Sequence, residues 1–270
     1  MKIGVFDSGF GGLTILEKIR RRLPQYDYIF LGDNARTPYG TRSFETVYAY
    51  TLQCVEKLFA MDCQMVILAC NTASAEALRT IQQNDLPHIA PERRVLGVIR
   101  PTVEAVGDLT QSRVVGLLAT EATVRSNSYP LEIAKLFPDI KVVSQACPMW
   151  VPLIENGEHT SAGADYFVQK YIDKLMAQNS RIDTLILGCT HYPLMIEKIR
   201  RFAPQGVRIV VQGDIVAESL ADYLKRHPEQ EIHCSKGGTV RYLTTESAEK
   251  FQSSASIFLK EKIVAEKIEL

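Results

Sequence analysis

Two short apolar runs, each ended by a cysteine and small polar residues, constrain the fold of this chain more than any other feature. MVILACNTAS carries Cys70, and TLILGCTHYP carries Cys189. Short apolar runs followed by a helix-start signal are typical of buried strands that turn directly into helices. We therefore expect each cysteine at a strand-to-helix turn, where backbone N–H groups stabilise a thiolate and can bind a carboxylate.

The alternation of strand and helix runs through the chain and restarts in its second half. Strands are expected at residues 3–6, 28–31 and 65–68, and the pattern begins again at residues 113–120. Strands separated by helices form mostly parallel sheets with right-handed crossovers. We predict an α/β fold of two similar parallel-sheet domains related by pseudo-twofold symmetry, with the active site in the interdomain cleft.

Changes in composition suggest where the two domains meet. The stretch 84–94 contains two prolines and adjacent charges, and an apolar run follows it. A further strand and helix follow Pro204, and this last part of the chain can rejoin the first domain. We expect a first α/β domain of residues 1–94 plus 208–270, with Cys70, and a second of residues 95–207, with Cys189.

Overall charge and hydropathy exclude several classes of protein. The chain has 31 basic and 31 acidic residues, so its overall field offers no reason to bind nucleic acid. No apolar stretch approaches the roughly 20 residues that cross a bilayer. The sequence starts with a strand pattern and without the pattern of a secretory signal. We expect a cytoplasmic protein that binds neither nucleic acid nor membrane.

The six cysteines contain no CxxC pair, so a structural metal site is not expected. In a reducing compartment they should be free thiols. Four of them lie outside the two cysteine-centred motifs and are expected as small buried side chains: Cys54, Cys63, Cys147 and Cys234.

Ligands of open parallel sheets bind beyond the carboxyl ends of the strands, and this rule sorts the candidate residues into two facing rims. The first rim comprises Asp7, Ser8, Tyr39, Gly40, Cys70, Asn71 and Thr72, and the second comprises Thr120, Thr123, Glu155, Cys189, Thr190 and His191. His191 lies where it can stabilise a Cys189 thiolate. Asp7 is either a helix cap or a group that receives a substrate ammonium or orients a thiol proton. Glu155, judged by its position alone, is a surface residue.

Five separated motifs resemble glutamate racemases of the aspartate/glutamate racemase superfamily. They are FDSGFGG at 6–12, PYG at 38–40, ACNTAS at 69–74, VPLIENG at 151–157 and GCTHYP at 188–193. The resemblance spans nearly the whole chain and implies cofactor-independent interconversion of L-glutamate and D-glutamate, with D-glutamate supplied for peptidoglycan. It also implies a homodimer.

The resemblance further implies roles for individual residues. Cys70 and Cys189 would flank the α-carbon, one thiolate removing the α-proton while the other thiol protonates the opposite face. Asp7 and His191 would assist them, and Glu155 matches a further acidic residue near the second thiol. Together with the rims, this gives the expected substrate-binding residues: Asp7, Ser8, Tyr39, Gly40, Asn71, Thr72, Thr120, Thr190 and His191.

Two departures from the family pattern lie near the expected domain junction. The loop at residues 88–94 is longer than usual, and Arg100 stands where an acidic residue is common. Both bear on assembly or regulation more than on the chemistry.

The chemistry of an amino-acid racemase agrees with these residues. The α-proton of a free amino acid is very weakly acidic, so the carbanion needs fixed donors and a site that excludes water. Helix N-termini at the two cysteines could supply such donors. No lysine lies in an identifiable pyridoxal phosphate context, and nothing in the sequence requires a metal or another cofactor.

Three other functions stay open at this point. An aspartate or other amino-acid racemase of the same superfamily would use the same cysteine pair on a side chain of different length. A cysteine hydrolase using Cys189 and His191 would need one essential thiol and form an acyl-enzyme. A two-domain amino-acid binding protein would use the cleft and need no thiol.

Overall fold

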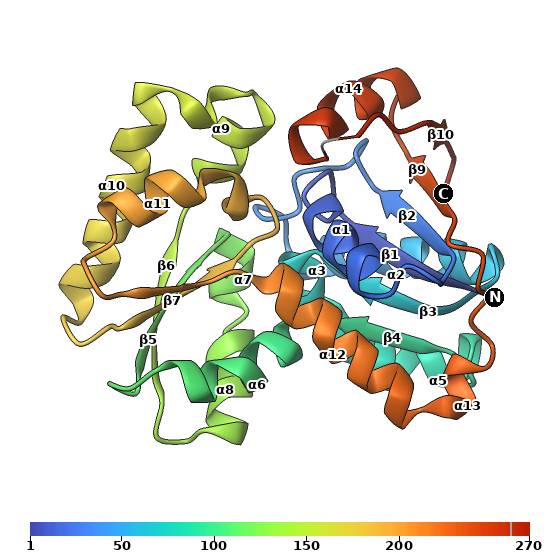
Figure 1. Cartoon of the computed structure of the whole chain (residues 1–270), viewed down its shortest axis with the longest axis horizontal. Helices are drawn as coiled ribbons and strands as arrows, with labels where there is room; N and C mark the ends of the chain where they lie inside the picture. Colours follow the sequence, from blue (N-terminus) through green and yellow to red (C-terminus); the bar gives the residue numbers. More distant parts are fainter. Residues whose placement is uncertain (260) are drawn as a thin grey trace.

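The computed structural model describes residues 1–259 and 261–270, which are built around two parallel sheets lying side by side (Figure 1). The first sheet contains β1 (Lys2–Asp7), β2 (Tyr28–Gly32), β3 (Cys63–Leu68), β4 (Arg94–Gly97), β9 (Val240–Thr244) and β10 (Ala265–Lys267). The second contains β5 (Val114–Ala119), β6 (Lys141–Ala146), β7 (Thr184–Gly188) and β8 (Arg208–Val210). All their strand pairs are parallel, which confirms the predicted α/β class.

Helices connect the strands and cover the sheets. In the first half of the chain they are α1 (Leu13–Arg22), α2 (Phe44–Ala60), α3 (Asn71–Glu76), α4 (Leu78–Thr80), the π-helical turn η1 (Ile81–Asp85), α5 (Leu86–Ile89), α6 (Ile99–Leu109), α7 (Glu121–Arg125) and α8 (Ser128–Leu136). In the second half they are α9 (Trp150–Glu155), the 3₁₀ turn η2 (Glu158–Thr160), α10 (Ala162–Gln178), the 3₁₀ turn η3 (Tyr192–Met195), α11 (Ile196–Phe202), α12 (Gln212–Arg226), α13 (Pro228–Glu231) and α14 (Ala248–Phe258).

Burial on both faces explains the continuous apolar runs of the sequence. Every residue of β2, β3, β5 and β7 is buried. Parallel strands covered by helices on both sides require such runs, whereas a half-exposed strand would alternate polar and apolar residues. The largest apolar core includes side chains from both sheets, among them Val5 of β1 and Leu187 of β7, so the two halves share one core.

The two sheets repeat one arrangement of strands. The first has the order β10-β9-β2-β1-β3-β4, and the second has the order β6-β5-β7-β8. In the first sheet, β1 lies between β2 and β3, and β4 lies beside β3. In the second sheet, β5 lies between β6 and β7, and β8 lies beside β7. The repeat expected from the sequence is therefore present in the topology, and β3 and β7, which precede the two cysteines, occupy equivalent places.

The C-terminal part of the chain returns to the first sheet. β9 pairs with β2, and β10 pairs with β9. Between the sheets, α12 leaves β8 and packs against α1 and α6 (Figure 1). The chain thus crosses between the domains twice, after β4 and after β8.

Strand pairing differs from the expected domain boundaries at two short strands. β4 pairs with β3 in the first sheet, although residues 95–97 were expected in the second domain. β8 pairs with β7 in the second sheet, although residues 208–210 were expected in the first domain. The stretch before β4 is largely helical up to Ile89 and serves as the crossover that parallel pairing requires. Pro87 fits there because the first helical turn needs no N–H at that position.

Two further expectations concern the membrane and the cysteines. None of the helices in the described part of the chain is long and apolar enough to span a membrane. All six cysteines are free and buried, which confirms the interpretation of Cys54, Cys63, Cys147 and Cys234 as buried thiols.

Candidate active site

Cys70 caps the helix that follows β3. Its sulfur accepts a hydrogen bond from the backbone N–H of Ala73 at 3.5 Å, and its thiol donates to Ser8 Oγ at 3.4 Å. Burial, reinforced by the nearby charge of Asp7, raises the pKa of the Cys70 thiol to about 12. The predicted strand-to-helix position is confirmed, and at neutral pH Cys70 is a neutral thiol.

Cys189 follows β7 and has a different environment. The next residues form the 3₁₀ turn η3 instead of the expected α-helix, which begins only at Ile196. The Cys189 sulfur lies 3.9 Å from Nδ1 of His191, and His191 Nε2 lies 3.1 Å from Glu155 Oε1. Burial opposes a charged imidazole, but the interactions with Cys189 and Glu155 outweigh it and raise the pKa of His191 to about 10. A protonated imidazole next to a sulfur stabilises its thiolate form.

Asp7 holds the turn that follows β1. Its carboxylate accepts hydrogen bonds from the backbone N–H of Gly9 at 3.1 Å and from Thr190 Oγ1 at 3.5 Å. Asp7 is fully buried, and burial raises its pKa although the charge of His191 acts in the opposite direction. This carboxylate therefore links the turn of the first domain to the segment that carries Cys189.

A cavity of about 70 Å³ lies where the two rims meet. Ten of the expected residues line it: Ser8, Tyr39, Gly40, Cys70, Asn71, Thr72, Thr120, Cys189, Thr190 and His191. Asp7, Thr123 and Glu155 do not line it; Glu155 reaches it through His191 and Asp7 through Thr190. The structure thus brings residues from both halves of the chain around one small space.

Several residues that line the cavity were not proposed as site residues from the sequence, although three of them, Pro38, Val151 and Pro152, lie in the quoted motifs. They are Thr37, Pro38, Thr41, Glu121, Cys147, Pro148, Val151 and Pro152. Cys147 follows the carboxyl end of β6, so the rule that selected the other rim residues could also have selected it.

Two glycines allow the domains to approach each other closely at this cavity. A Cβ atom on Gly11 would lie 2.2 Å from Thr190 Oγ1 and 2.5 Å from His191 Nδ1. A Cβ atom on Gly40 would lie 2.8 Å from Thr120 Cβ. Any larger residue would therefore displace the facing rim.

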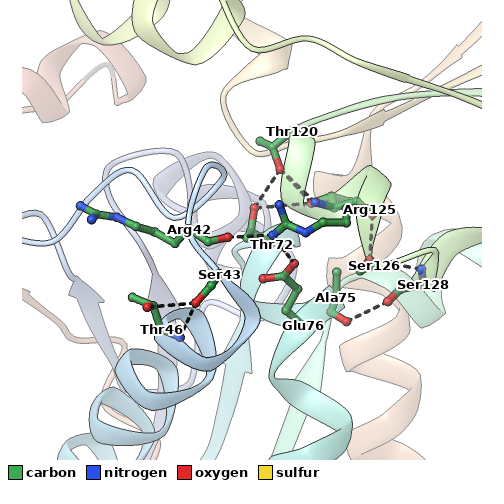
Figure 2. A network of polar contacts seen from close by, with 11 residues as sticks. Arg42, Ser43, Thr46, Thr72, Ala75, Glu76, Thr120, Arg125, Ser126 and Ser128 are labelled. Atoms are coloured by element: carbon green, nitrogen blue, oxygen red, sulfur yellow. Dashed lines mark hydrogen bonds and ion pairs between the residues drawn. The ribbon is translucent and has the colours of Figure 1, made fainter.

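Polar contacts join the domains beside the cavity, which Thr72 and Thr120 line (Figure 2). Thr72 Oγ1 lies 3.0 Å from Thr120 Oγ1 across the junction. Beside this pair, one nitrogen of Arg125 donates to Glu76 Oε1 at 3.0 Å and to the carbonyl of Arg42 at 2.7 Å. The Glu76 side chain is only 3% exposed, so this ion pair holds a carboxylate that water scarcely reaches.

Tyr39 lines the cavity, and its hydroxyl is already hydrogen-bonded to another side chain. The hydroxyl donates to Asp33 Oδ2, which also accepts from Arg36 Nε at 2.7 Å. Burial raises the pKa of Tyr39 far above its usual range, so the phenol stays protonated. Asp33 and Arg36 thus fix the Tyr39 ring against the cavity, a role that no sequence motif had indicated.

No group of three or more His, Cys, Asp or Glu side chains in the described ranges could hold a metal ion. The polar groups of the residues that line the cavity are hydroxyls, an amide, a carboxyl group, three thiols and an imidazole, and two of the thiols, Cys70 and Cys189, belong to the motifs found in the sequence. Such an arrangement can bind a small polar molecule and move protons at two separate sulfur atoms.

Comparison with known proteins adds independent information. The model of the Asp/Glu/Hydantoin racemase family matches residues 3–220. A glutamate racemase from a Ruegeria species is 41% identical over 276 residues, which cover 98% of this chain and 99% of that protein. Among solved structures, a glutamate racemase isoform from Bacillus anthracis has a TM-score of 0.90 at 33% identity, covering 100% of this chain and 97% of that one. The glutamate racemase from Francisella tularensis, solved in complex with D-glutamate, has a TM-score of 0.88 at 34% identity over 99% of this chain and 97% of that one.

Proposed function

The chain belongs to the Asp/Glu/Hydantoin racemase family, and from this premise we propose that it interconverts L-glutamate and D-glutamate by proton transfer at two cysteines. One observation carries the proposal. Cys70 and Cys189 follow equivalent strands of two different sheets, yet both line the same cavity. Racemisation without an electron-sink cofactor needs an acid and a base on opposite faces of one carbon atom, and two sulfurs that reach one cavity from different domains would meet that need.

The proposed reaction uses the unequal environments of the two sulfurs. In one direction the Cys189 thiolate removes the α-proton, which leaves a carbanion, and the Cys70 thiol donates its proton to the other face. Cys189 then carries the proton and Cys70 the negative charge, so the reverse reaction starts from Cys70. His191 stabilises the Cys189 thiolate and is itself oriented by Glu155. Ser8 contacts the Cys70 thiol and orients its proton.

The carbanion intermediate must be stabilised by groups that are fixed before the reaction. We propose that hydroxyl and amide donors around the cavity bind the α-carboxylate, where negative charge develops. The candidates are Ser8, Asn71, Thr72, Thr120 and Thr190. We propose that contacts across the domain junction, such as that of Thr72 with Thr120, keep water out of the cavity when substrate is bound, which would strengthen each of these interactions.

The experiment follows each enantiomer of glutamate in D₂O without added cofactor, using circular dichroism together with detection of α-deuterium. Loss of optical activity from both enantiomers, with deuterium incorporated at Cα, supports the proposal. A folded protein that leaves both enantiomers unchanged contradicts it. L-aspartate and D-aspartate form a parallel arm, and faster turnover of aspartate would favour the alternative racemase.

Substitution of the thiols separates the remaining alternatives. We expect Cys70→Ser and Cys189→Ser each to abolish racemisation, whereas Cys234→Ser, a buried thiol away from the cavity, retains it. A cysteine hydrolase would keep its hydrolytic activity in Cys70→Ser and lose it in Cys189→Ser. A binding protein would keep its ligand affinity in both variants.

Three wider features belong to the same proposal. We expect the product to supply peptidoglycan synthesis, so expression of the chain should restore growth of a bacterium that requires external D-glutamate. Both thiols must stay reduced, which fits a cytoplasmic location that cell fractionation can test. The homodimer rests on the family resemblance, and light scattering at several protein concentrations tests it.

A further inference from the structure

A closed ring of side-chain hydrogen bonds lies buried beside the cavity. The Tyr129 hydroxyl donates to Asn71 Oδ1 at 2.6 Å, and Asn71 Nδ2 donates to Gln212 Oε1 at 2.6 Å. Gln212 Nε2 then donates to the Tyr129 oxygen at 2.8 Å, which closes the ring. All three side chains are at least 97% buried. Each group in the ring both donates and accepts, an arrangement in which hydrogen bonds strengthen one another.

The ring lies on both crossings between the domains. Gln212 is the first residue of α12, directly after the crossing that follows β8. Its amide nitrogen also donates to Thr102 Oγ1 at 2.8 Å, and Thr102 in turn donates to the carbonyl of Val98, in the crossing that follows β4. Asn71 belongs to the first domain and Tyr129 to the second. One small network therefore fastens both crossings and both domains to each other.

The ring also determines how Asn71 faces the cavity. Because Tyr129 donates to its oxygen, the amide nitrogen must be the atom that faces Gln212. An Asn amide nitrogen carries two hydrogens, and Gln212 takes only one of them. Asn71 lines the cavity and directly follows Cys70, so the ring orients a candidate substrate donor and the segment that carries one sulfur.

We propose that Tyr129 and Gln212 are positioning residues for the proton transfers, acting through Asn71 and the two crossings to fix the separation of the Cys70 and Cys189 sulfurs. The inference rests on the proposed function. The sulfurs belong to different domains, so their separation depends on the angle between the domains, which the ring holds. Displacement of a reacting group by about 1 Å can lower a rate by about 100-fold.

The first test is Tyr129→Phe, which removes one hydroxyl and opens the ring. We expect kcat to fall about 10- to 100-fold in both directions, with a much smaller change in KM for glutamate. The primary isotope effect with α-deuterated glutamate should rise, because proton transfer then limits the rate more completely. Gln212→Glu is the second variant, since it keeps the acceptor for Asn71 and loses the donor to Tyr129 and Thr102. We expect Gln212→Glu to show the same fall in kcat and the same rise in the isotope effect, so it replaces Tyr129→Phe if that variant does not fold.

Tyr28→Phe provides the matched control. Tyr28 is also buried, and its hydroxyl donates to the carbonyl of Leu23 at 2.6 Å, within the first domain and away from the cavity. Both Phe variants should lose similar stability in urea unfolding, while only Tyr129→Phe changes kcat and the isotope effect. The inference is overturned if a folded Tyr129→Phe variant has the same kcat and isotope effect as the unchanged protein, or, where that variant does not fold, if Gln212→Glu has them. Absence of racemisation by the unchanged protein would instead contradict the proposed function.

Discussion

The different environments of the two thiols predict very different reactivities toward an alkylating reagent such as iodoacetamide. Only the thiolate reacts, and a pKa of about 12 leaves about one Cys70 in 10,000 as thiolate at pH 8. The two residues are comparably exposed, since Cys70 is 6% exposed and Cys189 is 7% exposed. We therefore expect Cys189 to be alkylated faster than Cys70, by at least about tenfold at pH 8.

Peptide mass spectrometry of samples quenched over time measures both rates in one experiment. The Cys70 rate should increase about tenfold for each pH unit between pH 7 and 10, because the thiolate fraction does so below the pKa. In His191→Asn the ratio of the Cys189 alkylation rate to the Cys70 alkylation rate should fall, since the cation next to the Cys189 sulfur is lost. Equal rates for the two thiols in the unchanged protein, or a faster reaction at Cys70, would refute the reasoning that Cys70 is held as a neutral thiol while His191 lies next to the Cys189 sulfur.

Three other substitutions give measurable outcomes. Gly11→Ala should lower kcat about 100-fold or more, because its Cβ would displace the facing rim, whereas Gly163→Ala, whose Cβ has space, should retain activity in the racemisation assay. Arg125→Ala should lower the free energy of unfolding by about 1–3 kcal/mol in urea titrations, because it leaves the buried carboxylate of Glu76 unpaired; adding Glu76→Gln should restore part of the loss. The raised pKa of His191 means that its charged form favours the folded state. That contribution is complete below pH 6.5 and is lost as the pH rises to about 10, so the stability difference between the unchanged protein and His191→Asn should shrink over this range.

The parts of the fold that follow from local sequence were predictable, and the parts that depend on pairing at sheet edges were not. The apolar runs before Cys70 and Cys189 carry their own signal, because a parallel strand covered on both faces has to be apolar throughout. β4 and β8 are only four and three residues long. Such short strands join whichever sheet edge lies nearby, which the sequence pattern does not encode.

The candidate site shows the same division. The residues that follow strands were found because one geometric rule brings them to the same edge. Position alone favoured a surface place for Glu155, and only the family resemblance put it near the second thiol. It lies 3.1 Å from His191, because α9 and the segment after β7 meet only in the folded chain. Tyr129 and Gln212 belong to no motif, and only the hydrogen bonds between distant elements reveal their connection.

The return of the chain terminus to the first sheet has a consequence for synthesis on the ribosome. The second sheet is complete once residue 210 has emerged, and it can fold while translation continues. The outer edge of β2, in contrast, waits for β9 (Val240–Thr244), which emerges about 30 residues after β8. Until then the nascent protein presents an unpaired strand edge, the kind of surface that templates aggregation. The first domain therefore begins to be synthesised before the second but completes its sheet after it. Aggregation through the unpaired edge of β2 is most favoured between the synthesis of β2 and the synthesis of β9.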